Sequence, residues 1–394
     1  MRLNNNKFLI LLFLLTVLSR LFSIYFYGDT DLVNEWRVIL LNFENDGIFG
    51  SRTVDGEVVP NIFMPPLYGI FLVSLNYFIG NIEILTLTVL YIQLILSTLS
   101  VFIIFNILKK FFSKKTCIIS TLIFSLFPLH VYSVGQISSI TLQIFFLTIF
   151  FYFIVKLTEF NNLKYFILLS VISSTLILLR AEFVLFFILS LIYIYFNKKN
   201  FKKILISFLL TLILISPYLV RNYIIFDKIV ITQSFGYNLW KGNNENLNVD
   251  GYYPDLNVNL NKKINDLGYN VKYDLLIDKI YQQEAIEFIK KHPSDITILY
   301  FKKIFSFLFL DLNSNYPNYY NFAHIIPKIL ISFTTLFGMY YGLRNKIFGY
   351  FSSYFLINIL VISIFFILPR YSLALFPCQI ILTSIYFDKF FKNT

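Results

Sequence analysis

The sequence has few charged residues and few of the residues that build disulfide or metal centres. Only 14% of its 394 residues are charged, and it contains two cysteines and three histidines. Both cysteines lie within apolar runs, so their spacing predicts neither a disulfide framework nor a zinc site. The histidines are isolated from one another, which argues against a histidine metal centre. These residues are Cys117, Cys378, His130, His292 and His324.

The scarcity of charge accompanies an excess of apolar residues. The chain is 57% hydrophobic, with a mean hydropathy of +0.69. A soluble domain of this length cannot bury so much apolar surface, because surface area falls slowly relative to volume. The formal net charge is +11, but lysines cluster beside apolar runs, at residues 109–115 and 198–203. Short basic loops of this kind are typical of the cytoplasmic side of membrane proteins, so we expect membrane lipids and no nucleic acid as partners.

The apolar runs predict about ten transmembrane helices, because each approaches the length needed to cross the hydrocarbon core. The runs are 8–27, 82–108, 116–135, 138–157, 164–180, 182–197, 203–220, 325–343, 347–368 and 371–387. Two further runs, 65–80 and 296–310, are short for a crossing, and the charge pattern places them on the outer surface as interfacial or re-entrant helices. The predicted fold class is an all-α polytopic membrane protein with two long extracytoplasmic loops.

The polar stretches between these runs divide the chain. Residues 28–64 and 221–295 are long and polar, and the charge pattern places both outside the cytoplasm. One amphipathic helix is expected at 278–291. We expect a multi-pass plasma membrane protein with three regions: an N-terminal transmembrane module (1–220) that carries the first outer loop, an extracytoplasmic loop with interfacial helices (221–310) and C-terminal transmembrane helices (311–394).

Two aspartates follow the first apolar run, in the segment GDTDLVNEW. Asp29 and Asp31 are expected at the outer membrane surface, where a carboxylate can act as a general base toward a hydroxyl or an amine. An aspartate in this position also commonly caps the helix that follows. The spacing alone favours the cap.

Three arginines, Arg180, Arg221 and Arg370, lie at the predicted outer ends of membrane spans, against the positive-inside tendency. A guanidinium group binds phosphate bidentately, so convergence of the three on one lipid phosphate would explain their positions. The alternatives are that each arginine reaches toward headgroup phosphates, and that Arg180 pairs with Glu182 in the same turn.

The segment FGYNLWKGNNENLNVDGYYP, residues 235–254, combines aromatic rings, amides and one lysine, Lys241. Aromatic faces and amide groups are the side chains that sugar recognition requires, because rings stack on CH faces and amides bond hydroxyls. An ordinary loop with glycine and asparagine turns has the same composition. Composition does not decide between the two interpretations.

Four segments together resemble a known family. They are GDTDLVNEW, PPLYGIFL, the block SPYLVRNYIIFDKIVITQSFGYNLWKGNN with its following GYYP, and RYSLALFP. In this order they resemble membrane glycosyltransferases of the GT-C fold, in the family 39-like branch that contains protein O-mannosyltransferases and lipid A aminoarabinose transferases. The resemblance extends over nearly the whole chain, and the RNY to GYNLWKGNN block is its most distinctive part.

The resemblance implies an enzyme that moves a sugar from a polyprenyl-phosphate carrier to a glycan, lipid or protein acceptor at the outer membrane face, with inversion. It implies an aspartate base, Asp31 or Asp29, and Asp31 fits better because Trp36 and DGIF follow at about the family's spacing. It assigns basic residues to the carrier phosphate and polar or aromatic residues to the sugar or acceptor. No cofactor is required; a divalent ion at Asp29 and Asp31 is the alternative. The candidate phosphate ligands are Arg180, Arg221, Arg370 and Lys241, and the candidate sugar or acceptor ligands are Glu35, Tyr68, Tyr237, Asn238, Trp240 and Asn243.

Two other functions fit a chain of this composition. A transporter or flippase of lipid-linked sugars predicts inverted repeats and ionisable residues near the bilayer midplane. The sequence shows no repeat, and the middle of the predicted spans is almost uncharged. A polymerase or ligase of lipid-linked glycans is expected to have conspicuous arginines in its large loop, whereas residues 221–295 have Arg221 only, at their edge.

Overall fold

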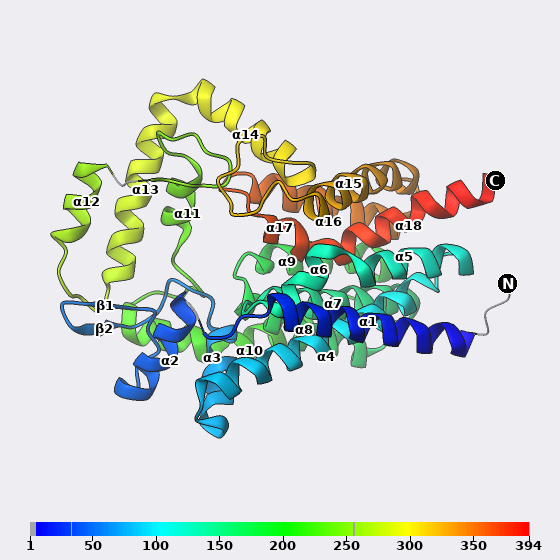
Figure 1. The fold of residues 1–394 in the computed structure, drawn as a ribbon, viewed down its shortest axis with the longest axis horizontal. Coiled ribbons are helices and arrows are strands. Elements are labelled where there is room, and N and C mark those ends of the chain that lie inside the picture. The colour runs from blue at the N-terminus through cyan, green and yellow to red at the C-terminus, as the bar shows by residue number, and fades with distance from the viewer. Residues whose placement is uncertain (1–4, 33, 255–256, 394) are drawn as a thin grey trace.

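Helices make up nearly all of the regular structure. The computed structural model describes residues 5–32, 34–254 and 257–393, and within these ranges two short strands accompany the helices. The long apolar helices run along the longest axis as a bundle, and both chain termini lie at one end of it (Figure 1). The polar segments gather at the opposite end, which we call the loop end.

The bundle is built from the apolar runs of the sequence. Its elements are α1 (Asn5–Tyr27), α4 (Ile82–Leu108), α5 (Lys114–Leu126), α6 (Pro128–Tyr132), η1 (Ser133–Gly135), α7 (Ile140–Glu159), α8 (Leu163–Leu179), α9 (Phe183–Lys198), α10 (Phe201–Phe226), α15 (Phe322–Gly342), α16 (Lys346–Ile362), α17 (Pro369–Ala374) and α18 (Phe376–Asn393). Small residues allow the helices to approach closely. The Ser170 and Ser207 hydroxyls join α8 to α10 at 2.8 Å, and a Cβ added to Gly338 of α15 would lie 1.9 Å from the Leu382 carbonyl oxygen of α18.

The loop end contains more regular structure than the sequence predicted. Residues 28–64 were expected as a polar loop, but they form a helix and a β-hairpin. The hairpin turns at Asp55 and Gly56, whose φ angles of 50° and 85° suit a two-residue turn that twists with the strands. The elements outside the bundle are α2 (Asn34–Asp46), β1 (Arg52–Val54), β2 (Glu57–Val59), α3 (Pro66–Ile79), α11 (Phe235–Gly242), α12 (Val258–Asn265), α13 (Tyr273–Lys291) and α14 (Pro293–Leu308).

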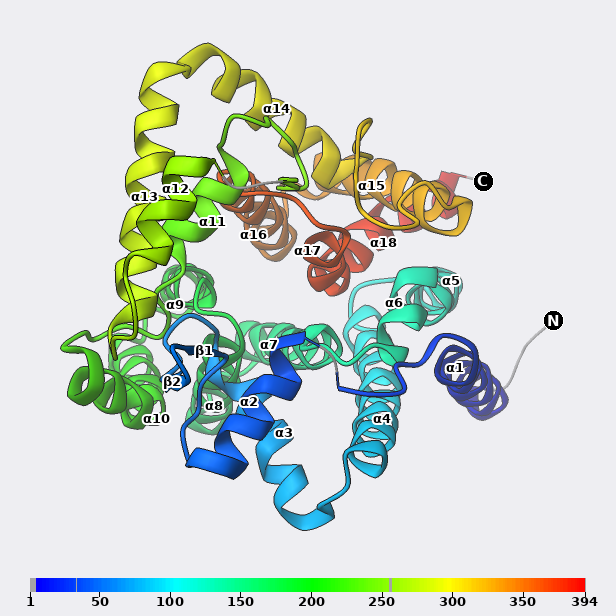
Figure 2. The same ribbon diagram turned by 60° about the vertical axis from the view of Figure 1, so that its left-hand side comes forward.

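The two long polar segments dock on each other at the loop end. The Gln233 amide donates to the Ile62 carbonyl at 2.8 Å. The Arg52 guanidinium lies 3.1 Å from the buried carboxylate of Asp274. These contacts join α13 to the segment of β1 and β2 at the loop end, which Figure 2 turns toward the viewer.

The predicted fold class is confirmed, whereas the predicted number of spans is not. Five described helices are long and apolar enough to cross a membrane, or six if the bent pair α5 and α6–η1 counts as one. Helices α3, α8, α9 and α16 are apolar but shorter. The run 116–135 is not one straight helix, because it bends by 49° at Phe127–Pro128, where proline lacks the amide hydrogen needed to continue.

Candidate active site

Asp29 is held by backbone groups just beyond the end of α1. Its amide donates to the Gly135 carbonyl at 2.8 Å, and its Oδ2 accepts from the Ile137 amide at 2.6 Å. The residue is half-buried, and this burial raises the pKa of its carboxyl, although the Ile137 hydrogen bond opposes the rise. Asp29 is therefore a fixed carboxylate of increased basicity.

Aromatic and amide side chains lie beside Asp29. The Gln93 amide donates to the Val134 and Gln136 carbonyls at 3.0 and 2.9 Å, directly before the Ile137 amide that binds Asp29. Burial, and secondarily the Asp29 charge, raise the pKa of the Tyr68 phenol. The Tyr68 hydroxyl donates to Gln93 at 3.4 Å, and its ring contacts Trp36 edge-on with centroids 4.7 Å apart. Tyr68 is buried, so it supports the site from below, whereas Glu35 in the first turn of α2 is partly exposed.

Asp31 has a different environment from Asp29. Its Oδ2 pairs with Arg37 at 2.5 Å, and its side chain is 43% exposed. Arg37 thus already neutralises this carboxylate. For a divalent ion, the described residues offer no group of three histidine, cysteine or acidic side chains that could hold it. The Ile137 amide binds one oxygen of Asp29, and Arg37 binds one oxygen of Asp31.

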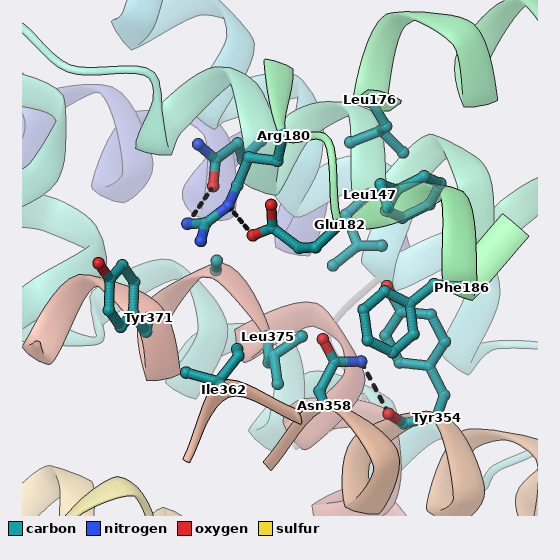
Figure 3. A pocket seen from close by; sticks show the side chains of 13 residues that line it. Leu147, Leu176, Arg180, Glu182, Phe186, Tyr354, Asn358, Ile362, Tyr371 and Leu375 are labelled. Atoms are coloured by element: carbon teal, nitrogen blue, oxygen red, sulfur yellow. Dashed lines mark hydrogen bonds and ion pairs between the residues drawn. The ribbon is translucent and has the colours of Figure 1, made fainter. Parts of the chain in front are cut away.

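Arg180 lies directly after α8, where it meets three other elements. Its Nε pairs with Glu182, and its Nη1 contacts the Gln143 side-chain oxygen of α7 at 3.5 Å. Its guanidinium carbon lies 5.1 Å from the centre of the Tyr371 ring in α17, as Figure 3 shows. The guanidinium is thus fixed on three sides by a carboxylate, an amide and an aromatic face.

Two further cations lie near the aromatic rings of Tyr371 and Phe366. The exposed Arg370 guanidinium lies 5.7 Å from the Tyr371 ring centre, and Lys241 Nζ lies 4.7 Å from that of Phe366. The two rings are 5.7 Å apart. Burial and the Arg370 charge lower the pKa of Lys241, while Asp250 opposes the shift. Three of the four predicted phosphate ligands therefore lie together, and we call Arg180, Lys241 and Arg370 the cation cluster.

A cavity of about 50 Å³ adjoins Arg180 of the cation cluster. Arg180, Glu182 and Tyr371 form its polar side (Figure 3). Its other walls are mostly apolar and come from α7, α8, α9, α16 and α17, with Leu147, Leu176, Phe183, Phe186, Ile362 and Leu375 among them. The site thus joins positive charge to an apolar interior.

Arg221 lies apart from the cation cluster. Its Nη1 donates to the Asn61 carbonyl at 2.6 Å and to the Asn222 side chain at 2.8 Å. Its guanidinium also lies 5.3 Å from the centre of the Phe226 ring. Among the described residues, its hydrogen bonds and ring contacts are with the first loop and with α10. Arg221 therefore attaches the loop to the bundle.

The predicted sugar-binding residues of segment 235–254 are largely engaged in packing. Trp240 is 7% exposed and contacts the rings of Tyr253 and Tyr281 at 4.9 and 4.8 Å. Asn243 is buried, with its amide donating to the Leu239 and Ile364 carbonyls and its oxygen accepting from Lys303. Both belong to the interior of the loop end.

Tyr237 and Asn238 of the same segment are half-buried. The Tyr237 hydroxyl lies 3.3 Å from that of Tyr253, and its amide donates to Asp278 at 2.9 Å. The Asn238 amide bonds Ser234 within its own helix at 3.3 Å. Lys241 Nζ lies 5.9 Å from the centre of the Tyr237 ring, so Tyr237 borders the cation cluster. No described contact joins Asn238 to Asp29 or to the cation cluster.

Comparison with known proteins supports the fold and its family resemblance. Residues 65–220 match a family model described as dolichyl-phosphate-mannose-protein mannosyltransferase. The oligosaccharyltransferase AglB of Archaeoglobus fulgidus, solved with an inhibitory peptide and a dolichol-phosphate, superposes with a TM-score of 0.60 at 12% identity, over 98% of this chain and 50% of AglB. The chain has the GT-C fold. The predicted resemblance to this group of membrane glycosyltransferases is thereby confirmed.

Other oligosaccharyltransferase structures from Archaeoglobus fulgidus give similar results. The form tethered to an acceptor peptide has a TM-score of 0.59 at 10% identity, over 98% of this chain and 49% of that one. The complex with Zn and sulfate has a TM-score of 0.57 at 11% identity, over 98% and 49%. The chain thus spans about half the length of these GT-C structures. No curated protein matched it in the sequence comparison.

Several residues of the candidate site carried no signal in the sequence. Gln143 lies in an apolar run and was not distinguished from its neighbours. Tyr371 adjoins the predicted Arg370, but only the fold shows that its ring contacts Arg180 as well. The backbone amide of Ile137 has no side-chain signature. A search for polar residues near the ends of apolar runs would have found Gln143.

Proposed function

We propose that this chain is a glycosyltransferase of the plasma membrane that moves a sugar from a polyprenyl-phosphate carrier to an acceptor at the extracytoplasmic loop end. One observation carries the proposal. Asp29 binds the segment just before α7 through the Ile137 amide, and Arg180 contacts the first turn of α7 through the Gln143 side chain. These two contact points are six residues apart, and six residues of chain span at most about 22 Å. The candidate base and a candidate phosphate-binding cation are thus both attached to the segment that leads into α7.

The chemistry requires two protein groups. The Asp29 carboxylate takes the proton of an acceptor hydroxyl or amine, and the acceptor atom attacks the anomeric carbon of the donor sugar. The bond between that carbon and the carrier oxygen breaks, and the lipid phosphate leaves with the electron pair. The cation cluster stabilises its added charge. A single displacement of this kind inverts the anomeric carbon.

Asp29 is preferred to Asp31 as the base on electrostatic grounds. A general base works best when its pKa approaches the working pH, and burial moves the pKa of Asp29 in that direction. Asp31 instead pairs with Arg37 and is exposed. Asp31 is the alternative base if the acceptor displaces Arg37. Glu35 and Tyr68, which flank the aspartates, are the candidate acceptor contacts.

The size of the cavity limits how the donor enters. At about 50 Å³ it is far smaller than the 300–1,000 Å³ usual for ligand pockets. We therefore place only the phosphate of the carrier at the cation cluster, with the sugar directed toward Asp29 and the lipid chain along the bundle surface. The AglB structure that contains a dolichol-phosphate supports a lipid phosphate as the ligand of this fold.

The proposal is tested with the purified full chain in lipid vesicles. Wild-type protein receives polyprenyl phosphates that carry radiolabelled sugars, together with a membrane extract as the source of acceptor. We expect label to leave the carrier only when the extract is present, and Asp29→Asn to stop the transfer. Movement of intact labelled carrier across the vesicle membrane without sugar transfer would refute the proposed glycosyltransferase activity and favour a flippase.

A further inference from the structure

Arg20 is a buried charge in the middle of α1 that the proposed function does not use. Its side chain is 0% exposed, and among the described residues no carboxylate lies within ion-pair distance of it. A charge buried in a membrane helix is costly, so its retention calls for a specific partner. It donates hydrogen bonds to oxygen atoms of Ser19, Ser97 and Ser125, and its Nη2 lies 3.4 Å from Nδ1 of His130.

The partners of Arg20 lie at the break between α5 and α6. Pro128 has no amide hydrogen for the carbonyl of Phe124, and the extended backbone of Phe127 ends the intrahelical pairing of Ser125. Both carbonyls are nevertheless satisfied. Arg20 Nη1 donates to the Ser125 carbonyl, and His130 Nδ1 lies 3.0 Å from the Phe124 carbonyl. A cation at the carboxyl end of α5 is also favourable toward the helix dipole.

The hydrogen bonds of this cluster form one consistent set. Because His130 Nδ1 is closer to the Phe124 carbonyl than to Arg20, at 3.0 against 3.4 Å, we place the imidazole hydrogen on Nδ1. Nε2 then accepts from the Ser97 hydroxyl at 3.1 Å, while the same hydroxyl oxygen accepts from Arg20 Nε at 3.2 Å. The two carbonyls freed at the break, those of Phe124 and Ser125, thus have His130 and Arg20 as their partners.

The segment after the break is the one that holds Asp29. It passes through α6 and η1 to Gly135 and Ile137, which bond the Asp29 amide and carboxylate. The same segment is hydrogen-bonded to the end of α1, because the Gln136 side chain donates to the Tyr27 carbonyl at 2.7 Å. A Cβ on Gly135 would lie 3.1 Å from the Ser23 carbonyl oxygen, so the two segments are in close contact.

We infer that Arg20 is a positioning residue, which sets the bend at Phe127–Pro128 and through it the Ile137 amide that orients Asp29. Arg20 lies in α1, and Asp29 lies just beyond the end of this helix. The two are nine residues apart, or roughly 13 Å along the axis. Arg20 fixes the start of the α6–η1 segment and Asp29 binds its end. The effect on transfer rests on the proposed function, whereas the effect on the segment does not.

The position of the segment is measured without activity. The native cysteines are first removed by Cys117→Ala and Cys378→Ala. The substitutions Tyr27→Cys and Gln136→Cys then place two thiols at the contact between α1 and this segment, and the rate of oxidative cross-linking reports their proximity. We expect Arg20→Met to reduce the cross-linking rate at least fivefold and Arg20→Lys to reduce it less. An unchanged rate in Arg20→Met would overturn the inference, whether or not transfer activity exists.

Two other variants protect the test against misfolding. Ser97→Ala removes one hydroxyl that links Arg20 to His130, so we expect a smaller effect in the same direction. Ser190→Ala removes a comparable buried contact, to the Tyr350 hydroxyl at 2.7 Å on the far side of the bundle, and should leave the rate unchanged. Equal losses in Ser97→Ala and Ser190→Ala would indicate general destabilisation and refute a specific role.

The kinetic readout distinguishes positioning from folding. We expect Arg20→Met to lower kcat by tenfold or more while KM for the donor changes less than threefold. The acidic limb of the rate profile should move to higher pH, because loss of the Ile137 hydrogen bond removes what lowers the pKa of Asp29. A uniform loss of folded protein with an unshifted pH profile would refute this role. Absence of transfer by wild-type protein would refute the proposed function alone.

Discussion

Lys241 and Asn243 are two residues apart in one short segment, yet they lie in regions of opposite character. Lys241 belongs to the cation cluster. Arg370 of this cluster is exposed, and no described carboxylate forms an ion pair with Lys241 or with Arg370. Asn243 lies in the packed layer of the loop end, where each of its polar atoms already has a protein partner. The difference teaches that a polar side chain is available to a ligand only when its neighbours leave a charge or hydrogen bond unmatched.

The largest expected effect separates Asp29 from Asp31. Asp29→Asn keeps the size of the side chain and its bond to the Ile137 amide but removes the proton acceptor, so kcat should fall by about 10²–10⁴-fold. Asp31→Asn should reduce it by less than about tenfold, because Arg37 already neutralises that carboxylate. Single-turnover transfer in vesicles measures both. The reverse order of effects would make Asp31 the base.

The pH dependence sharpens the same comparison. Transfer requires ionised Asp29, and since burial raises its pKa, the rate should fall on acidification at a pH above the usual aspartate value of about 3.9. Asp31→Asn should leave this acidic limb in place. If the acidic limb of the rate profile shifts in pH in Asp31→Asn but not in Arg20→Met, the assignment of Asp29 as the base and of Arg20 as a positioning residue would both be contradicted.

The next effect compares the cation cluster with Arg221. Lys241→Gln and Arg370→Gln should each raise KM for the donor by roughly 10–100-fold, since charge-assisted phosphate contacts are lost. Arg221→Gln should instead lower the free energy of unfolding by about 1–3 kcal/mol through lost bonds to the first loop. Donor titration and thermal unfolding of the same preparations separate the two. A donor KM that rises only in Arg221→Gln would contradict the assignment.

The sequence predicted the membrane fold better than the local geometry of the site. Hydropathy identifies apolar helices because burial in lipid dominates their free energy. It does not show that residues 116–135 bend at Pro128, because a proline in a membrane helix is tolerated when side chains such as Arg20 satisfy the freed carbonyls. The Asp55–Gly56 pair is a typical hairpin turn, but its flanking strands are too short to show a clear alternation of apolar and polar residues.

The candidate site was predicted in part, for a comparable reason. Arginines at outer span ends predicted a phosphate site, and Arg180 and Arg370 do share the Tyr371 ring. The sequence could not show that Arg221 bonds Asn61, 160 residues away along the chain. It also could not show that Trp240 faces Tyr281. Such contacts depend on how distant segments dock, which no local pattern encodes.

A smaller effect concerns the packed layer itself. Lys303 is 0% exposed in α14 and donates to Asn243 at 3.0 Å, and burial lowers its pKa to about 7. In the unfolded chain its pKa is about 10.4, so the unfolded state binds more protons between these values and stability should rise with pH from about 7 to 10. Lys303→Met should remove this rise in thermal unfolding midpoint. Transfer per folded molecule should stay within about twofold, and a loss of donor binding would place Lys303 in the site.

The smallest expected effect tests whether the cation cluster is partly occupied by the protein itself. Glu182 pairs with Arg180, and a carrier phosphate must compete with this carboxylate for the same guanidinium. The pair is partly exposed, at 26% and 38% for the two side chains, so its net contribution is at most about 1 kcal/mol. Glu182→Gln should therefore lower the dissociation constant for polyprenyl phosphate about two- to fivefold, measured by titration in vesicles. Asp31→Asn is the matched control, because it frees Arg37 outside the cation cluster and should leave that constant unchanged. Weaker binding in Glu182→Gln would mean that the carboxylate orients Arg180 toward the phosphate and does not compete with it.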